Sequence, residues 1–287
     1  DPPLSPSMPV DHYENFPVAS WLCPPALRPA VQAIYWYART ADDLADEGEA
    51  SARQRHADLL AYRADLRRVA RGEPPSPRWA GVFTPLAEVL KQHTLPLKLL
   101  EDLLSAFEQD VNVTRYADRP ALLDYCRRSA NPIGRLLLHL YGVHDELALQ
   151  RSDAICTALQ LINFWQDLSV DLPRGRLYIP LKDCAAGGVD PDDLLAGQDG
   201  LATRSLVANE VAWARQLMAS GAPLATSLPG HVARRLGWEL RLVVQGGLAI
   251  ADQIEAMDYA TVARRSKLRA WHAPLMFWRA LRMGGKA

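Results

Sequence analysis

The chain has few cysteines, no long uncharged apolar run and almost no net charge, and each of these absences excludes a class of protein. Its four cysteines lie far apart and form no CxxC pair, which argues against a disulfide framework or structural zinc and indicates a reducing compartment. No apolar run approaches the ~18 residues that a membrane-spanning helix needs. With a formal net charge of −1 and no long block of one sign, we expect no nucleic acid partner.

Several catalytic signatures are also missing. The chain contains no GxxxxGK[ST] loop, GxSxG elbow or HExxH pair. No glutamate is followed by histidine three residues later, which argues against a di-iron carboxylate bundle. Without a GxGxxG fingerprint, we expect no tightly bound nicotinamide. Residues 1–10 are proline-rich and lack an apolar stretch, so we expect no signal peptide and a cytoplasmic protein.

What the sequence does contain is helical periodicity along most of its length. Nearly half of the 287 residues are hydrophobic, which is enough for a large core or a large apolar cavity. We predict loops over 72–85 and 183–200, and helices over 27–47, 52–70, 85–93, 96–111, 120–141, 146 to about 172, 203–219, 230–258 and 273–283. The fold class is therefore all-α, a bundle of about eight to ten helices. One domain over 1–287 is favoured over two.

A first polar stripe lies near the end of the helix predicted over 27–47. Tyr35, Arg39, Asp42 and Asp46 are separated by four, three and four residues. At about 100° per residue, they fall within roughly 60° of one another on one helical face. A tyrosine, an arginine and two carboxylates therefore share one stripe.

A second polar stripe lies near the end of the helix predicted from 146 to about 172. Gln160, Asn163, Asp167 and Asp171 are separated by three, four and four residues and span roughly 80° of the helix. The residues around them are strongly apolar, so this helix should be buried. Its polar stripe should then be buried as well, or should line a cavity.

Both stripes place carboxylates in the last turn of a helix, before Gly48 and before Pro173. Each carboxylate there faces the negative end of the helix dipole, at a cost of roughly 0.3–1 kcal/mol. A solvated acidic face is the ordinary alternative, but two such placements indicate a cation. Magnesium bridges one or two carboxylates to phosphates, so facing stripes of this kind can hold a diphosphate. Arg174, Arg176 and Tyr178 follow the second stripe and are placed to contact it, with a basic surface loop as the alternative.

The two stripes together resemble the aspartate motifs of the head-to-head prenyl synthases, the squalene and phytoene synthase family. The first and second motifs of that family are similar to Tyr35-x-x-x-Arg39-x-x-Asp42-Asp43-x-x-Asp46 and Gln160-x-x-Asn163-x-x-x-Asp167-x-x-x-Asp171. The resemblance covers most of the chain, from about residue 12 to residue 264. It implies an isoprenoid synthase fold, in which the motifs face each other across a central cavity, and a prenyl diphosphate substrate.

The resemblance also implies roles for individual residues. Magnesium and diphosphate would be bound by Asp42, Asp46, Asn163, Asp167 and Asp171. The phosphates or the reacting carbons would be contacted by Tyr35, Arg39, Asp43 and Gln160. Further substrate contacts would come from Tyr125, in a helix lining the pocket, and from a basic cluster of Arg264, Arg265 and Lys267.

Two stretches indicate a branch of this family. Residues 12–20 carry Glu14 where the family often has serines and a lysine, and this acid would repel a second diphosphate. Together with residues 126–135, this stretch is most similar to the hydroxysqualene-forming branch of the bacterial hopanoid pathway. That branch ionises presqualene diphosphate, opens the cyclopropane and captures the cation with water. Tyr35, Tyr37, Phe164 and Trp165 are candidates to shield a cation, with ordinary core packing as the alternative.

Other interpretations stay open at this point. Condensation of two farnesyl diphosphates to presqualene diphosphate or squalene is the main alternative, with hydride rather than water ending the squalene route. A phytoene-type synthase and a non-catalytic helical assembly factor are further alternatives. The tail from residue 274 mixes aromatics with arginines, which suits either peripheral contact with the inner membrane surface or a last helix packed on the bundle. The sequence does not determine the oligomeric state or the number of magnesium ions.

Overall fold

The computed structural model describes residues 23–266 and 273–283, and within these ranges every regular element is a helix. An isolated bridge between Arg115 and Leu177 is the only β-type pairing there. Ten helices have ten or more residues: α1 (Arg28–Asp46), α2 (Ala52–Ala70), α3 (Ala80–His93), α4 (Leu97–Asp110), α5 (Arg119–Ser129), α6 (Asn131–Leu140), α7 (Glu146–Gln166), α11 (Leu201–Gly221), α14 (Trp238–Ala256) and α15 (Ala273–Arg282). The shorter segments are η1 (Pro77–Trp79), α8 (Leu168–Asp171), η2 (Leu172–Arg174), α9 (Leu181–Ala186), α10 (Pro191–Leu195), α12 (Leu224–Ser227), α13 (Gly230–Val232) and η3 (Ala233–Gly237).

The all-α prediction is confirmed, but several boundaries differ from those expected. The region predicted as one helix over 120–141 is broken at Ala130, because Pro132 has no N–H to continue the hydrogen-bond ladder of α5. The predicted loops 72–85 and 183–200 contain helical turns, and α3 begins inside the first of them. The helix predicted over 230–258 starts with the short α13 followed by a π-type turn, so that the long regular helix α14 begins at Trp238. The helix predicted to run from 146 to about 172 ends at Gln166.

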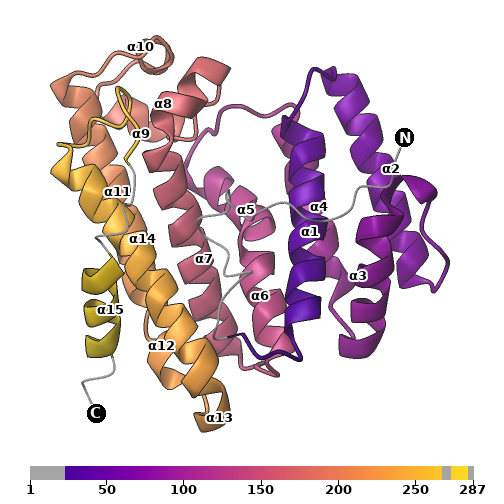
Figure 1. Ribbon diagram of the computed structural model, residues 1–287. Coiled ribbons are helices and arrows are strands. Elements are labelled where there is room, and N and C mark those ends of the chain that lie inside the picture. Colours follow the sequence, from indigo (N-terminus) through magenta and orange to yellow (C-terminus); the bar gives the residue numbers. More distant parts are fainter. Residues whose placement is uncertain (1–22, 267–272, 284–287) are drawn as a thin grey trace.

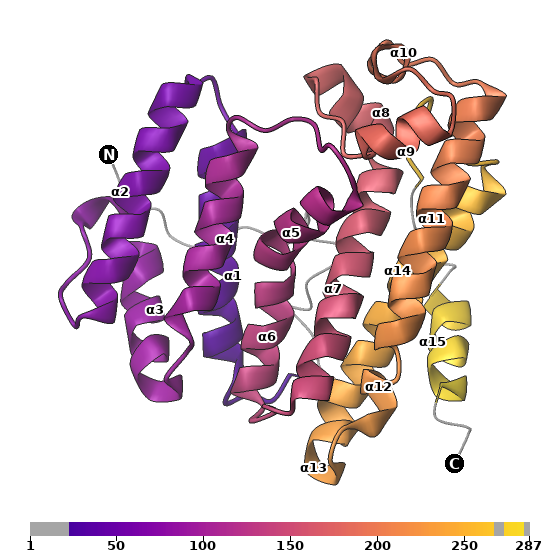
Figure 2. The same ribbon diagram turned by 180° about the vertical axis from the view of Figure 1, so that it is seen from behind.

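The interior consists of two hydrophobic cores, which we call the first and the second core. The first core joins α1, α2, α3 and α4 and includes Leu136 and Leu140 of α6. The second core joins α5, α7, α11 and α14 and includes Leu138 of α6. Figures 1 and 2 show the two groups of helices on opposite sides, with α5 and α6 between them. Helix α1, which carries the first acidic stripe, belongs to the first core, and α7 and α8, along which the second stripe lies, belong to the second.

Helix α7 is closely packed by its neighbours, and two glycines allow the close approach. A Cβ atom added to Gly221, at the end of α11, would lie 2.5 Å from the carbonyl oxygen of Arg151 in α7. A Cβ atom added to Gly247 of α14 would lie 2.7 Å from Cδ2 of Leu159. Two neighbouring helices therefore fix the position of α7 tightly.

A partly buried ion-pair network joins α5 to α9 and α11, away from the acidic stripes. Arg119 donates to Asp183 (Nε to Oδ2, 2.7 Å) and to Glu210 (Nη2 to Oε1, 3.1 Å), and its guanidinium lies 4.3 Å from the ring centre of Trp213. Glu210 is fully buried. Burial raises the pKa of Glu210 to about 7, although the charge of Arg119 opposes this rise.

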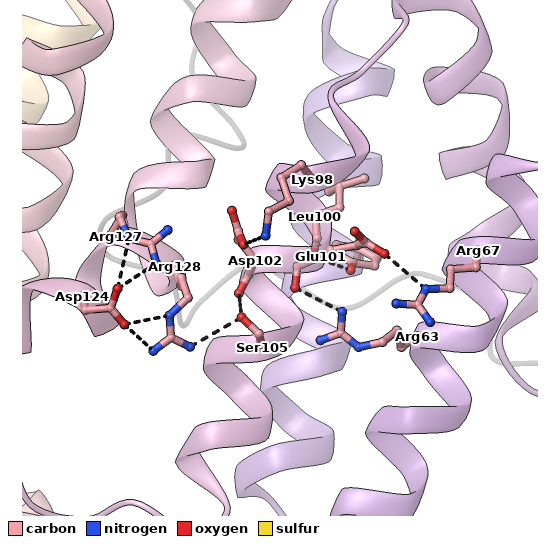
Figure 3. A network of polar contacts seen from close by, with 11 residues as sticks. Arg63, Arg67, Lys98, Leu100, Glu101, Asp102, Ser105, Asp124, Arg127 and Arg128 are labelled. Carbon is pink, nitrogen blue, oxygen red and sulfur yellow. Dashed lines mark hydrogen bonds and ion pairs between the residues drawn. The ribbon is translucent and has the colours of Figure 1, made fainter. Parts of the chain in front are cut away.

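Polar contacts also join the outer face of α4 to the helices on either side (Figure 3). Arg67 of α2 donates to Glu101 of α4 (Nε to Oε1, 3.2 Å), and Arg128 of α5 donates to Ser105 of α4 (Nη1 to Oγ, 3.4 Å). On α4 itself, the hydroxyl of Ser105 donates to the carbonyl oxygen of Asp102 at 2.9 Å. These contacts lie on the outside of the first core, and they leave the opposite face of α4 to apolar residues.

The last described helix, α15, packs against α14. Arg279 forms an ion pair with Asp252 at 2.6 Å, and the rings of Phe277 and Trp238 are stacked with centroids 6.1 Å apart. The tail is thus a helix on the bundle, yet large apolar side chains remain about half exposed along it: Leu275, Phe277, Trp278 and Leu281. None of the described helices is long and apolar enough to cross a membrane.

Candidate active site

The first acidic stripe runs along about the last three turns of α1. A buried face that includes Ile34, Tyr37 and Ala41 holds the helix in the first core, and the stripe lies beside that face. Tyr35 is almost fully buried, while Arg39, Asp42 and Asp46 are partly exposed. The helix ends at Asp46, one residue before the predicted end, so its last carboxylates do lie at the negative end of the dipole.

Within this stripe, Arg39 is the centre of an ion-pair cluster. Its guanidinium lies 3.6 Å from Oδ2 of Asp42, 2.5 Å from Oδ1 of Asp43 and 2.7 Å from Oε1 of Glu47. These three acids hold the guanidinium beside the end of the helix. Burial raises the pKa of Asp43, and the charge of Arg39 opposes this effect.

The second stripe continues past the end of α7 into α8. Although α7 ends at Gln166, the amide of Asp167 donates to the Asn163 carbonyl and the amide of Asp171 donates to the Asp167 carbonyl, both at 2.9 Å. The i to i+4 spacing of the stripe therefore survives the break. Gln160 and Asn163 are half-buried on α7, so all four predicted residues lie along one continuous path.

The segment after α8 carries the arginines toward the first stripe. Gly175 adopts φ +76°, which turns the chain back, and the amide of Leu177 then donates to the Thr114 carbonyl at 2.8 Å. This anchoring places Arg176 against Asp46, with which it forms a charged hydrogen bond. Arg174 lies 3.6 Å from the other oxygen of Asp46. Residues adjacent to the second motif thus contact the last acid of the first.

The segment following α14 reaches the second stripe from another direction. The amide of Ser169 donates to the Thr261 carbonyl at 3.0 Å, and the side chain of Gln166 donates to the Ser266 carbonyl at 2.8 Å. These bonds bring Arg265 to Asp167, with Nη2 3.2 Å from Oδ2.

The basic cluster expected near the C-terminus is brought to the site only in part. Arg264 is exposed, and its amide donates to the Ala260 carbonyl. Lys267 and the stretch around Glu14 lie outside the described residues.

The carboxyl groups of both stripes share one electrostatic environment. Burial raises the pKa values of Asp42 and Asp171 to about 6, and the nearby charge of Asp46 adds to both increases. Burial also opposes ionisation of Asp46, but the hydrogen bond and charge of Arg176 outweigh it and lower the pKa of that group below its ordinary value. The contacts of Arg174 and Arg176 with Asp46 bring the chain that follows the second stripe to the end of the first stripe.

A further acid in this region, Asp110, was not predicted from the sequence. It is the last residue of α4, and Tyr125 donates a hydrogen bond to its Oδ2 at 2.8 Å. Its Oδ1 is buried without a hydrogen-bond partner in the described part of the chain. Burial raises the pKa of Asp110 to about 7, and the charges of Asp42 and Asp46 contribute to this rise. An acid that ends an amphipathic helix was the only signal available in the sequence.

Aromatic rings form a wall beside the acids. Phe164 of α7 and Tyr178 are stacked, with centroids 3.8 Å apart and planes within 6° of each other. Tyr125 lies against both rings, at 6.2 Å from Phe164 and 6.4 Å from Tyr178, and Tyr116 stacks on Tyr178 at 6.0 Å. Tyr125 and Tyr178, both predicted to contact substrate, therefore lie in one aromatic cluster next to Asp110 and Arg176.

The donor set suits magnesium. Within the described ranges no three acidic, histidine or cysteine side chains are preassembled as a metal cage. The groups that meet are hard oxygen donors, and they raise one another's pKa because their negative charges are crowded. Such a set fits an ion that takes one or two carboxylates and completes its shell with water and phosphate oxygens.

Comparison with protein families shows where this site belongs. Residues 10–272 match the family model described as squalene/phytoene synthase. The chain belongs to this family. It is a prenyl diphosphate-dependent synthase of the head-to-head type, and its fold is the isoprenoid synthase fold.

The synthase is similar to several characterised proteins. It is 37% identical over 233 residues to the hydroxysqualene synthase of Zymomonas mobilis, covering 80% of this chain and 75% of that one. It is 34% identical over 247 residues to the hydroxysqualene synthase of Rhodopseudomonas palustris, covering 85% and 79% of the two chains. The crystal structure of squalene synthase HpnC from Alicyclobacillus acidocaldarius matches with a TM-score of 0.77 and 37% identity, covering 86% and 90%.

Proposed function

We propose that this synthase ionises presqualene diphosphate, opens its cyclopropane ring and captures the cation with water, releasing hydroxysqualene and diphosphate. The observation that carries the proposal is the meeting of the two acidic stripes at Arg176, directly beside the aromatic cluster of Phe164 and Tyr178. A charged end and an apolar end therefore adjoin, as a prenyl diphosphate requires. The names of the two similar curated relatives support this branch of the family.

The arginines of the site act on the leaving group. Arg176 and Arg174 pair with Asp46 of the first stripe, and Arg265 pairs with Asp167 of the second. When the C–O bond breaks, negative charge grows on the diphosphate, and fixed guanidinium groups stabilise this charge more than they stabilise the intact substrate. The acids that now pair with these arginines keep them oriented before substrate binds.

The aromatic cluster acts on the hydrocarbon part. The rings of Phe164, Tyr178 and Tyr125 form an apolar wall beside the acids, and Tyr125 and Tyr178 are buried. Their π faces stabilise a positive charge on carbon, and their size keeps solvent water away from it.

The acids and Asn163 would hold the metal ion. Magnesium bound by Asp42, Asp46, Asn163, Asp167 and Asp171 would neutralise the charge of the diphosphate. Nicotinamide has no role in this route.

A product assay by mass spectrometry tests the proposal. Purified protein with magnesium receives presqualene diphosphate or farnesyl diphosphate, each with and without NADPH. We expect hydroxysqualene from presqualene diphosphate alone and no turnover of farnesyl diphosphate. Presqualene diphosphate or squalene from farnesyl diphosphate would move the protein to a condensing branch of the family, and turnover of neither substrate would support a non-catalytic role.

Variants of the acids test the site within the same assay. Asp42→Asn and Asp167→Asn should each lower the rate of product formation by about 10²-fold or more, because each removes a charge that the diphosphate complex needs. Asp153→Asn is the matched control, since Asp153 lies earlier on α7 and pairs with an arginine (Arg135, 2.6 Å) but away from both stripes. Chelation of magnesium should abolish activity, and added magnesium should restore it. Full activity of the two site variants would refute the assignment.

A further inference from the structure

A small cavity lies along α1, next to the first acidic stripe. Three polar side chains, Tyr35, Arg39 and Ser129, line it together with Ala38, Leu103, Phe107 and Ile133. The cavity leaves about 30 Å³ for the centre of a water molecule, whereas one water needs roughly 10–15 Å³. It is formed where α1 and α4 meet the junction between α5 and α6, at the seam between the two halves seen in Figure 2.

Ser129 is the unusual member of this lining. It is the last residue of α5, and its Oγ atom is buried without a hydrogen-bond partner in the part of the chain that the structure describes. A serine at such a position could bond to a backbone carbonyl one turn earlier, but no such bond is present. A buried hydroxyl without a partner is unfavourable, and an adjacent water would satisfy it. The cavity has the room for that water.

The cavity also lies at the right distance from the diphosphate site. Along α1, Arg39 precedes Asp42 by about one turn and Tyr35 precedes it by about two, or roughly 5 and 10 Å. Along α5, Ser129 lies one turn after Tyr125, which contacts Asp110 in the acid cluster. Both helices therefore place this cavity, with Ser129 in its lining, within about one to two turns of acids of the site.

The chemistry of the three polar groups makes Ser129 the acceptor for a bound water. Arg39 can only donate hydrogen bonds, and its guanidinium is already held by three acids. Ser129 can accept a hydrogen bond from a water O–H, which leaves an oxygen lone pair free to face the cavity. The apolar remainder of the lining would limit the number of waters near the cation.

We infer that Ser129 positions the water that ends the reaction, an assignment that rests on the proposed function. Heterolysis of the C–O bond of presqualene diphosphate leaves its electron pair on diphosphate and a cation on carbon. The water held by Ser129 forms the new C–O bond as the cyclopropane opens, and the proton it loses passes to a diphosphate oxygen. Without an ordered water, the cation instead loses a proton from a neighbouring carbon and gives a hydrocarbon with one more double bond.

The test is the ratio of alcohol to hydrocarbon formed from presqualene diphosphate with magnesium, measured by mass spectrometry, with diphosphate release measured in parallel. In Ser129→Ala we expect diphosphate release within about twofold of the unmodified protein and an alcohol-to-hydrocarbon ratio about tenfold lower. Ser129→Thr and Ser129→Val form a matched pair of nearly equal shape, and only the threonine variant should keep the alcohol. Ser105→Ala is the control. The hydroxyl of Ser105 donates to the Asp102 carbonyl on the outer face of α4, so its removal should leave the ratio unchanged.

The possible outcomes separate this inference from the proposed function. If the unmodified protein makes hydroxysqualene and Ser129→Ala keeps the same ratio, the positioning role is overturned while the function stands. If diphosphate release and alcohol fall together in the alanine and valine variants, Ser129 supports ionisation or folding, and the inference is again overturned. If the unmodified protein makes no hydroxysqualene from presqualene diphosphate, both proposals fail.

Discussion

Replacing Gly221 with alanine tests how tightly α11 holds α7, the helix that carries Gln160 and Asn163 of the second stripe and leads into Asp167. The new Cβ would lie 2.5 Å from the carbonyl oxygen of Arg151 and 2.9 Å from the amide nitrogen of Ile155, both of them backbone atoms of α7. Real Cβ atoms essentially never approach another heavy atom closer than 3.0 Å, so the two helices must separate by about 0.5 Å at this point. Backbone cannot rotate away as a side chain can.

The expected cost follows from this geometry. Overpacking of a close-packed interior costs about 1–3 kcal/mol, and the better helix propensity of alanine returns at most about 1 kcal/mol. We therefore expect Gly221→Ala to lower the free energy of unfolding by roughly 1–2 kcal/mol. In a chain of this size, that corresponds to a fall in Tm of about 2–6 °C.

Gly246→Ala is the matched control for this experiment. Gly246 lies inside α14, and a Cβ added there meets only Cε of Met276, at the ordinary contact distance of 3.5 Å. The same chemical change should there raise the free energy of unfolding by about 0.5–1 kcal/mol through helix propensity. Urea denaturation followed by circular dichroism measures both variants. If Gly221→Ala were as stable as Gly246→Ala, the close approach of α11 to α7 would be refuted.

Three more perturbations have expected outcomes. Arg176→Gln should lower kcat/KM with a prenyl diphosphate by about 10²-fold, with Arg176→Lys losing less, because it removes the charge held against Asp46; steady-state kinetics would contradict this if both variants were fully active. Because the pKa of Glu210 in the folded protein is raised to about 7, its carboxyl group contributes to the free energy of unfolding only while it is protonated. This contribution is fully present below pH ~4.5 and is lost as pH rises through ~7. Glu210→Gln should therefore gain up to ~1–3 kcal/mol relative to the unmodified protein between pH 5 and pH 8, and a difference independent of pH in urea titrations would oppose this. If α15 contacts membranes peripherally, the double variant Trp278→Ser and Leu281→Ser should co-sediment less with anionic liposomes while its Tm stays unchanged. Co-sedimentation equal to that of the unmodified protein would refute membrane contact through α15.

The sequence allowed the two stripes to be predicted because helical periodicity is a local property. Residues separated by three or four positions share a face wherever a helix forms, and α1 forms almost as expected. The second stripe was predicted on one unbroken helix, although α7 ends at Gln166. The stripe persists because backbone hydrogen bonds of Asp167 and Asp171 keep the same offset across the break.

The residues that sequence reasoning missed are defined by contacts between distant segments. Asp110 joins the site only because Tyr125 and Arg176 reach it from other elements, and no local pattern marks it. Ser129 lines a cavity whose other walls come from α1, α4 and α6, so the sequence around Ser129 does not reveal it. Likewise, Arg265 contacts Asp167 across almost a hundred residues of chain, a contact that depends on how the segment after α14 packs. Tertiary packing decides each of these cases.

The division of the interior into two cores has a consequence for product release. Because each stripe belongs to a different core, a diphosphate bound between the stripes contacts both halves of the molecule at once. Its binding free energy therefore helps to hold the two halves together, and this cohesion increases with the fraction of sites that are occupied. A ligand at a hundred times its Kd contributes about 2.7 kcal/mol in this way. Once the C–O bond is broken, the diphosphate can leave by itself, and its departure removes that cohesion. We therefore expect the loss of the small, water-soluble product to come first and to loosen the seam through which the large, water-insoluble one escapes.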